Sequence, residues 1–283
     1  MVNPEQAEGM SSGKSLQSED NSIQPEDDSP QSEDKSLEHF KAHHHPRLIA
    51  KRLADGPESV FIKDFVYGAV DGAITTFAIV AGVAGAGLSA GIIIILGFAN
   101  LLADGFSMAV SNYLGTRAEN QHRINVRQME LDEIEQFPEG EKEEVRQIFA
   151  RKGFKGKLLE DAVEVITADR EKWIDTMVQE EHGLSLQDHD AFKAGLATFV
   201  AFCLVGFVPL ITYVANWIFP GTIANPFFWS ILLTGIAFFW VGAVKGQFVS
   251  QHWLLSGLET VGVGGIAAGM AYGVGVLLKG IVG

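Results

Sequence analysis

The sequence predicts an all-α membrane protein in which five transmembrane helices carry a helical cytosolic insert between the second and third helices. Three observations lead to this fold class. Apolar runs long enough to cross a bilayer recur along the chain, 47% of the 283 residues are hydrophobic, and the charges gather in separate segments. Outside residues 1–60 and 116–193 the chain holds only four acids and three bases, so we predict that these remaining residues lie in the membrane.

Residues 1–60 are predicted to form a disordered acidic tail followed by a basic juxtamembrane segment. The first 40 residues are rich in Ser, Gln, Glu, Asp and Pro, and SLQSED recurs in them almost unchanged as SPQSED. Such a segment buries too little apolar surface to offset the entropy lost on ordering. It also lacks the basic start and apolar core of a signal peptide. We interpret His43, His44 and His45 as a solvated cluster, with metal recruitment as the alternative.

Residues 61–115 are predicted to form the first two transmembrane helices. The run from 65 to 88, FVYGAVDGAITTFAIVAGVAGAGL, suffices for a hydrocarbon core of about 30 Å. Gly68 and Gly72 form a small-x-x-x-small pair that permits close approach of another helix. The second span begins at Gly91, and no proline interrupts the polar residues that follow it up to Glu135. We therefore expect one helix that leaves the membrane and continues in water.

Residues 116–190 are predicted to form a cytosolic helical domain rich in carboxylates. The sequence Phe-Pro-Glu-Gly at 137–140 predicts a break, and helices are expected near 141–152, 157–167 and 169–182. Apolar residues recur at helical spacing in each of these segments, which predicts a compact domain with its own core.

Residues 191–283 are predicted to form the last three transmembrane helices, near 192–218, 227–248 and 258–278. Pro209 is expected to kink the third span. The last span carries Gly265, Gly269 and Gly273 on one face, which indicates close packing against another helix.

The distribution of basic residues predicts the orientation of the chain. Seven Lys and Arg residues near span ends lie on the side shared by the N-terminus and the insert, whereas only Lys279 lies on the other side. Both the N-terminus and the insert are therefore expected in the cytosol. The formal net charge of -14 disfavours nucleic acid as a partner and favours cations. Cys203 is the only cysteine, which excludes an intrachain disulfide and a cysteine metal cluster.

Two polar faces in the predicted membrane segments are candidates for an ion path. Asp71 and Thr75 share one face of the first span, and Asp104, Met108 and Asn112 recur at four-residue intervals in the second. Carboxylates within a membrane usually mark an ion or proton path. Oxygen ligands suit hard divalent cations, and a thioether adds preference for a transition metal, so the pattern favours iron or manganese. In the alternative, Met108 only packs and Asp104 pairs with Lys245.

The insert contains candidate metal ligands at helical spacing. Glu130 and Glu133, and likewise Glu141 and Glu144, are three residues apart, so each pair of carboxylates shares a helix face where a cation could bridge it. The predicted break could fold the two faces together. The last helix of the insert could complete the cluster with Met177, Glu180 and Glu181. The alternative is that these glutamates form ordinary solvated helix faces.

An enzyme is not predicted. Glu119-x-x-His122 matches half of the motif of a di-iron bundle, but the second half is absent from the insert. Motifs for Ser/His/Asp catalysis, phosphate-binding loops and H-E-x-x-H zinc sites are also absent from the sequence. The secondary site candidates are Glu119, His122, Glu180, Lys245 and Glu259.

Three stretches resemble the vacuolar iron transporter family, especially its bacterial branch without a ferritin-like fusion. They are VYGAVDGAITTFAIVAGVAGAGLS, ADGFSMAVSNYLGTRAE and KGQFVSQHWLLSGLETVGVGGIAAGMAYGVG, and the match runs from Phe61 to Gly283. The resemblance implies a homodimer of five-span protomers that exports cytosolic Fe2+ or related ions (Mn2+, Zn2+, Co2+) in exchange for protons, without a prosthetic group. It also implies a multi-pass integral protein, and we expect the bacterial inner membrane rather than a vacuolar one.

The resemblance also implies roles for particular residues. Asp71 and Met108 match positions that line the transport path of the family. The cytosolic metal ligands of the family correspond by register to Glu130, Glu133, Glu141, Glu144, Glu181 and Met177. Plant and fungal members have Gly-Glu-Tyr where this chain has Ser111-Asn112-Tyr113, and Asp104 is a partial substitute for the missing carboxylate. Alternatives are a manganese-selective or broad divalent exporter, and a membrane-tethered metal sensor or buffer without flux.

Overall fold

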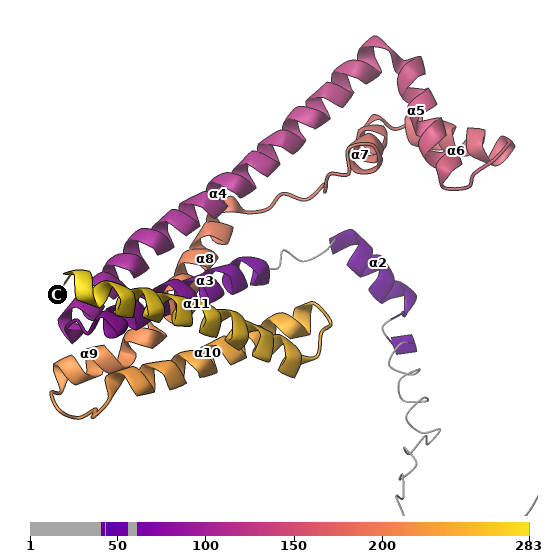
Figure 1. Ribbon diagram of the computed structural model, residues 1–283. Coiled ribbons are helices and arrows are strands. Elements are labelled where there is room, and N and C mark those ends of the chain that lie inside the picture. The colour runs from indigo at the N-terminus through magenta and orange to yellow at the C-terminus, as the bar shows by residue number, and fades with distance from the viewer. Residues whose placement is uncertain (1–40, 43, 56–60, 283) are drawn as a thin grey trace, which may run out of the picture. The chain divides into compact units, whose positions relative to one another are not determined.

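The computed structural model describes residues 41–42, 44–55 and 61–282, and the regular structure in these residues is helical (Figure 1). The tail predicted to be disordered, residues 1–40, and His43 lie outside the described residues. The chain divides into two compact units, Met1–Glu58 and Ser59–Gly283. In the first unit, helix α2 (Pro46–Asp55) begins at a proline, which suits the first turn because an N–H there has no partner within the helix.

Five segments of the second unit are long and apolar enough to cross a membrane. This finding confirms the predicted all-α fold class with five spans, as judged by length and composition over the described residues. The segments are α3 (Ile62–Ala86), α4 (Ala90–Gln136), α8 (Ala191–Gly206) continued by α9 (Ile211–Ile218), α10 (Pro226–Phe248) and α11 (Trp253–Val282).

Helix α3 is central to the packing because it contacts α4, α8, α10 and α11. Its glycines allow the close approach of α8. A Cβ atom at Gly68 would lie 2.3 Å from the carbonyl oxygen of Thr198, and one at Gly72 would lie 2.4 Å from that of Phe202. Buried apolar residues of α3, α4 and α8, including Phe77, fill the core around this contact. The small-x-x-x-small pair thus lies where two helix backbones meet, as the sequence predicts.

The third span is interrupted at Pro209, as predicted. A short 3-10 helix, Val208–Leu210, separates α8 from α9. Proline lacks a backbone N–H and so cannot continue the α-helical hydrogen-bond pattern. The carbonyl oxygen of Pro209 instead accepts a hydrogen bond from Ser230 Oγ of α10 at 2.7 Å.

Helix α4 joins the apolar spans to the insert and has 47 residues, which corresponds to about 70 Å of helix. It ends near the predicted break, where Phe137 adopts φ -142° and ψ 64° and the next helix begins at a proline. The other insert helices are α5 (Pro138–Arg151), α6 (Lys157–Thr167) and α7 (Arg170–Glu180) (Figure 1). Their predicted positions agree within a few residues. Apolar side chains of all four helices form one core that includes Val126, Val145 and Trp173.

Polar contacts tie α4 to the chain that returns from the insert. Asn120 Nδ2 donates to the carbonyl oxygen of His189 at 2.7 Å, and Arg123 donates to Gln187 and Asp188. Further along α4, Arg127 pairs with two acids of α7, and Glu135 accepts from Arg170. These contacts recur along the polar half of α4 and restrain its direction relative to α7.

Replacing Gly72 tests the packing of α3 against α8. We expect Gly72→Ala to lower the free energy of unfolding of the detergent-solubilised protein by about 1–3 kcal/mol, which is measured as a lower melting temperature. The reason is that the new Cβ would overlap backbone atoms of α8, which cannot rotate away as a side chain can. Gly235→Ala is the matched control, since a Cβ at Gly235 meets no atom within 4 Å. Equal melting temperatures for Gly72→Ala and the control would contradict this packing.

Candidate metal centre

Two carboxylates are buried where α4 meets α5. Glu130, on α4, is 1% exposed, and Glu141, in the first turn of α5, is 5% exposed. They come together because the chain reverses at Phe137 and Pro138. The Oε2 atom of each carboxylate is buried and has no hydrogen-bond partner. Such atoms are costly to bury, so their presence here requires an explanation.

Further acids lie around these two. Oxygen atoms of Glu130, Glu133 and Glu141 all lie within 4.8 Å of one another, and a second such group joins Glu130 to Glu181 and His182. Glu144 interacts electrostatically with Glu141 and Glu181. The structure therefore brings together all five insert glutamates that the family resemblance indicated. Both groups have spacing suited to oxygen or nitrogen ligands of one divalent ion.

The electrostatics of this carboxylate cluster disfavour its full ionisation. Burial raises the pKa of Glu141 to about 7, and the carboxylates of Glu144, Glu130, Glu133 and Glu181 add to the shift. The pKa of Glu144 is also raised, first by burial and then by Glu181. A cation among these carboxylates would stabilise their ionised form, because its positive charge offsets both the cost of burial and the repulsion between the carboxylates.

The remaining candidates of the insert have different environments. Met177 is fully buried and packs in the core of the insert. Glu180 forms an ion pair with Lys152 and does not belong to either group of candidate ligands. His182 was not predicted as a ligand. The sequence signal that could have indicated this ligand was its position next to Glu181. Its contact with Glu130 joins residues 52 positions apart, and helical spacing does not indicate such a contact.

Within the spans, the structure brings the two predicted acids together. The carboxylates of Asp71 on α3 and Asp104 on α4 lie close enough to interact electrostatically. Thr75 Oγ1 donates to the backbone oxygen of Asp71 at 2.9 Å and accepts from Asn100 Nδ2 at 3.1 Å. Sequence reasoning missed Asn100. Met108 is partly buried against the apolar core.

Asn112 is a donor at a junction of three helices. Its Nδ2 atom donates to Asp64 Oδ1 at 2.9 Å, to Thr198 Oγ1 at 2.8 Å and to the carbonyl oxygen of Ala194 at 3.2 Å. Asp64 is a second polar residue that sequence reasoning missed. A carboxylate in this position could accept from the Thr198 hydroxyl but could not donate to Asp64 Oδ1 or to the carbonyl oxygen of Ala194, because it has no hydrogen to donate.

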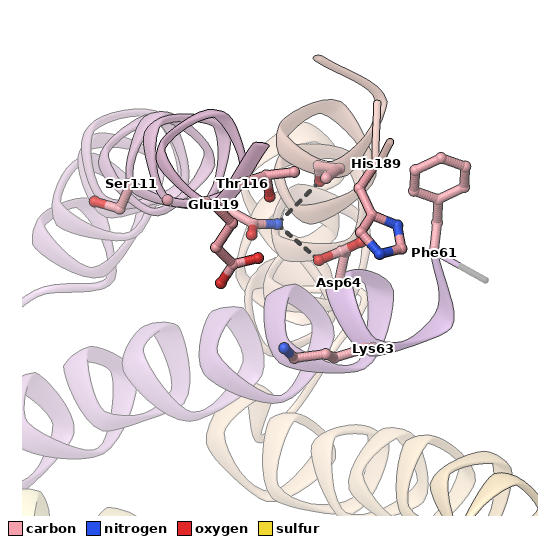
Figure 2. Close-up of a pocket in the computed structure, with 10 residues that line it drawn as sticks. Phe61, Lys63, Asp64, Ser111, Thr116, Glu119 and His189 are labelled. Atoms are coloured by element: carbon pink, nitrogen blue, oxygen red, sulfur yellow. Dashed lines mark hydrogen bonds between the residues drawn. The ribbon is translucent and has the colours of Figure 1, made fainter. Parts of the chain in front are cut away.

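A polar pocket of about 260 Å³ lies beside Asn112. Figure 2 shows Asp64, Glu119 and His189 around it, contributed by α3, α4 and the segment before α8. Glu119 and His189 both line this pocket, whereas His122, the predicted companion of Glu119, is exposed. The pocket holds side-chain types that bind cations, and its residues on α4, such as Glu119, lie between Asp104 and Glu130 along that helix.

The alternative pairing of Asp104 with Lys245 is wrong. Lys245 Nζ lies 3.1 Å from Glu259 Oε2, which joins α10 to α11. Asp104 instead lies close enough to Asp71 for the charges of the two carboxylates to interact. The secondary candidates Lys245 and Glu259 therefore form an ion pair with each other.

Five apolar helices, with a cluster of buried carboxylates on the helices inserted between the second and third, define an integral membrane protein with a candidate cation site. Residues 62–276 match the VIT family, and the chain belongs to this family.

Proteins with assigned names agree with this membership. The chain is 35% identical over 224 residues to a vacuolar iron transporter of Plasmodium berghei (strain Anka), covering 77% of this chain and 82% of the relative. It is 35% identical over 231 residues to a vacuolar iron transporter of Toxoplasma gondii (strain ATCC 50861 / VEG), covering 80% and 76%. Vacuolar iron transporter 1 of Arabidopsis thaliana is 31% identical over 212 residues, covering 75% and 83%. The relatives bear the names of transporters rather than enzymes, and the family resemblance is confirmed.

The raised pKa of Glu141 predicts how pH affects the metal-free insert. Because the pKa is raised from 4.5 to about 7 in the folded protein, this residue contributes most stability below pH 4.5, and the contribution is lost as pH rises through 7. Glu141→Gln should therefore slow hydrogen exchange in α5 at pH 8 by roughly 10–100-fold in the presence of a chelator, and leave it unchanged at pH 4.5. The control is Glu164→Gln on the exposed face of α6. Faster exchange in Glu141→Gln at pH 8 would contradict the assigned cause.

Replacing Asn112 tests the donor role of its amide. We expect Asn112→Asp to destabilise the protein by about 1–3 kcal/mol at neutral pH, because the new carboxylate faces Asp64 and donates to none of its former acceptors. The check is the melting temperature in detergent, with the exposed Ser111→Asp next to it as control. A stability equal to that of the control would refute the donor role.

Proposed function

We propose that this protein is a proton-coupled divalent metal transporter that moves Fe2+ first, and Mn2+ second, out of the cytosol. The observation that carries the proposal is the pair of buried carboxylate oxygens, Glu130 Oε2 and Glu141 Oε2, which lack partners within a cluster of like charge. The names of the relatives support iron as the transported ion. The proposed cytosolic position of the insert agrees with the distribution of Lys and Arg.

In this proposal the carboxylate cluster captures the ion. Its ligands are Glu130, Glu133, Glu141, Glu144 and Glu181, with Met177 as a neighbouring sulfur donor. Carboxylate oxygens attract hard divalent ions, and a thioether favours a transition metal over Mg2+ and Ca2+. Burial raises the pKa of Glu141, and the mutual repulsion of the carboxylates adds to this shift. That repulsion also favours binding, because a divalent cation relieves it.

The transport path then follows α4 into the membrane. The polar pocket at Asp64, Glu119 and His189 supports a passage between the cluster and the spans. Beyond it, Met108, Asp71 and Asp104 would bind the ion, with Thr75 and Asn112 holding the surrounding polar contacts. The ion is the cargo of this path, and no prosthetic group is involved.

Proton coupling follows from the two acids within the spans. Asp71 and Asp104 interact with each other, so both are stabilised by a divalent ion or by protons. Protons that reach them from the far side would displace the ion, and its release would leave the acids able to carry the protons inward. A homodimer in the bilayer is supported by the open glycine face of α11, where a Cβ at Gly265, Gly269 or Gly273 meets no atom within 4 Å.

The test of transport is Fe2+ flux into proteoliposomes that contain the full chain, under anaerobic conditions and an imposed pH gradient. We expect Asp71→Asn to abolish Fe2+ flux together with the accompanying proton movement, because the ion and the proton share this carboxylate. Asp132→Asn, exposed on α4, is the matched control and should transport like the parent. Flux in Asp71→Asn equal to that of the parent would refute the coupling role.

A second experiment separates a transporter from a membrane-tethered sensor or buffer. The double variant Glu130→Gln/Glu141→Gln should bind metal more weakly and transport it more slowly at low concentration, while flux persists at high concentration. Metal binding by the parent without flux at any gradient would identify a sensor. Competition among Fe2+, Mn2+, Zn2+ and Co2+ distinguishes an iron transporter from a manganese-selective or broad divalent exporter.

A further inference from the structure

His182 lies at the edge of the carboxylate cluster, two residues beyond the end of α7. Its Nε2 atom is 2.7 Å from Glu130 Oε1 and 3.9 Å from Glu181 Oε2. The Glu130 side chain is 1% exposed and the His182 side chain 24%, so the imidazole covers the buried carboxylate and remains accessible. The contact joins the end of α7 to the last two turns of α4.

The termination of α7 fixes the position of this imidazole. The backbone N–H groups of Glu181 and His182 both donate to the carbonyl oxygen of Met177, and Leu184 N donates to that of Val178. Gly183 has φ +65°, a left-handed conformation in which glycine avoids the strain of a side chain. The helix therefore ends in a defined turn that holds His182 over Glu130.

A simple pairing of His182 with Glu130 does not account for the site. It satisfies Oε1 of Glu130 and leaves Oε2 of both Glu130 and Glu141 buried without a partner. A structural ion pair would place its charges so that these acceptors are also satisfied. Ligand atoms of Glu130, Glu181 and His182 lie within 4.8 Å of one another, which leaves them able to converge on one ion.

We infer that His182 is a nitrogen ligand of the metal captured by the carboxylate cluster, and that it strengthens the preference of this site for transition metals over Mg2+. The inference rests on the proposed capture function of the cluster. A neutral imidazole with its proton on Nδ1 presents the Nε2 lone pair to the ion, beside one oxygen of Glu130 and one of Glu181. The hydrogen bond of the metal-free site is thereby replaced by two bonds to the metal.

This ligand has a consequence for selectivity. A site of oxygen atoms alone suits Mg2+, Ca2+ and Mn2+, whereas an imidazole favours later transition metals. Mg2+ prefers oxygen ligands and retains its waters, so replacing an oxygen with a nitrogen selects against it. His182 thus provides discrimination against Mg2+ at the point of capture.

The experiment uses the purified full chain in detergent and compares His182→Gln with the matched control His122→Gln. His122 is an exposed histidine of α4 that belongs to neither group of candidate ligands. Pulsed electron paramagnetic resonance of bound Mn2+ should show the 14N coupling of a coordinated imidazole in the parent and in His122→Gln. We expect this coupling to vanish in His182→Gln. We also expect the affinity for Co2+ to fall at least about 10-fold and that for Mg2+ to change by less than about 3-fold.

A third variant guards against simple loss of folding. His182→Glu replaces nitrogen by oxygen, so it should bind Mn2+ without 14N coupling and show a smaller preference for Co2+ over Mg2+ than the parent, with Met177 left as the softer donor. Persistence of the 14N coupling in His182→Gln, or an equal fall in Co2+ and Mg2+ affinity in both His182 variants, would overturn the assignment of His182. Mn2+ binding without 14N coupling in the parent would overturn the same assignment and leave the carboxylate cluster intact. No metal binding by the parent would overturn the capture function itself.

Discussion

The stability of the insert depends on how it accommodates two neighbouring carboxylates that are shielded from water. Glu130 and Glu141 are each almost fully buried, and each has one oxygen without a partner. Removing a carboxylate from water without compensation costs several kcal/mol, and a second carboxylate nearby adds to that cost. Burial of apolar residues around Val145, Ile174 and Val178 offsets part of it. Protonation offers partial relief, as the pKa of about 7 for Glu141 indicates, and a divalent cation offers more.

Helix α4 relates this cluster to the membrane. Glu130 and Met108 lie on one continuous helix, and their separation of 22 positions corresponds to about 33 Å. Individual surface ion pairs contribute little stability, but Arg123, Arg127 and Arg170 all link α4 to the returning chain and together restrain its direction. In the proposed transport, an ion captured at the cluster would travel about this distance to reach the acids of the spans. The pocket beside Asn112 lies part of the way along α4, and Glu119 and Asp64 both line it.

Much of the fold could be predicted from the sequence because it depends on local properties. Apolar length located the five spans, the missing N–H of Pro209 located the interruption of the third, and the Phe-Pro-Glu-Gly sequence located the end of α4. Three-residue spacing likewise indicated the paired glutamates. In each case the residues that decide the structure are neighbours along the chain.

The contacts that were not predicted are tertiary. His182 meets Glu130 across 52 residues, and Asn112 meets Asp64 across 48 and Thr198 across 86. Spacing on one helix carries no information about such contacts. Glu180 and Glu181 show the same limit on a smaller scale. Consecutive helix positions differ by about 100° in direction, so one of the two faces Lys152 and the other faces the cluster.

The central claim is that the carboxylate cluster binds a divalent metal ion, and anomalous X-ray diffraction tests it most directly. Crystals of the full chain grown with Mn2+ should give an anomalous difference peak at the carboxylate cluster. This peak should lie about 2.0–2.3 Å from oxygen atoms of Glu130 and Glu141. The two Oε2 atoms that lack partners should be among its ligands. If crystals saturated with Mn2+ show anomalous peaks at other places but none at Glu130 and Glu141, the carboxylate cluster does not bind the metal and the central claim is wrong.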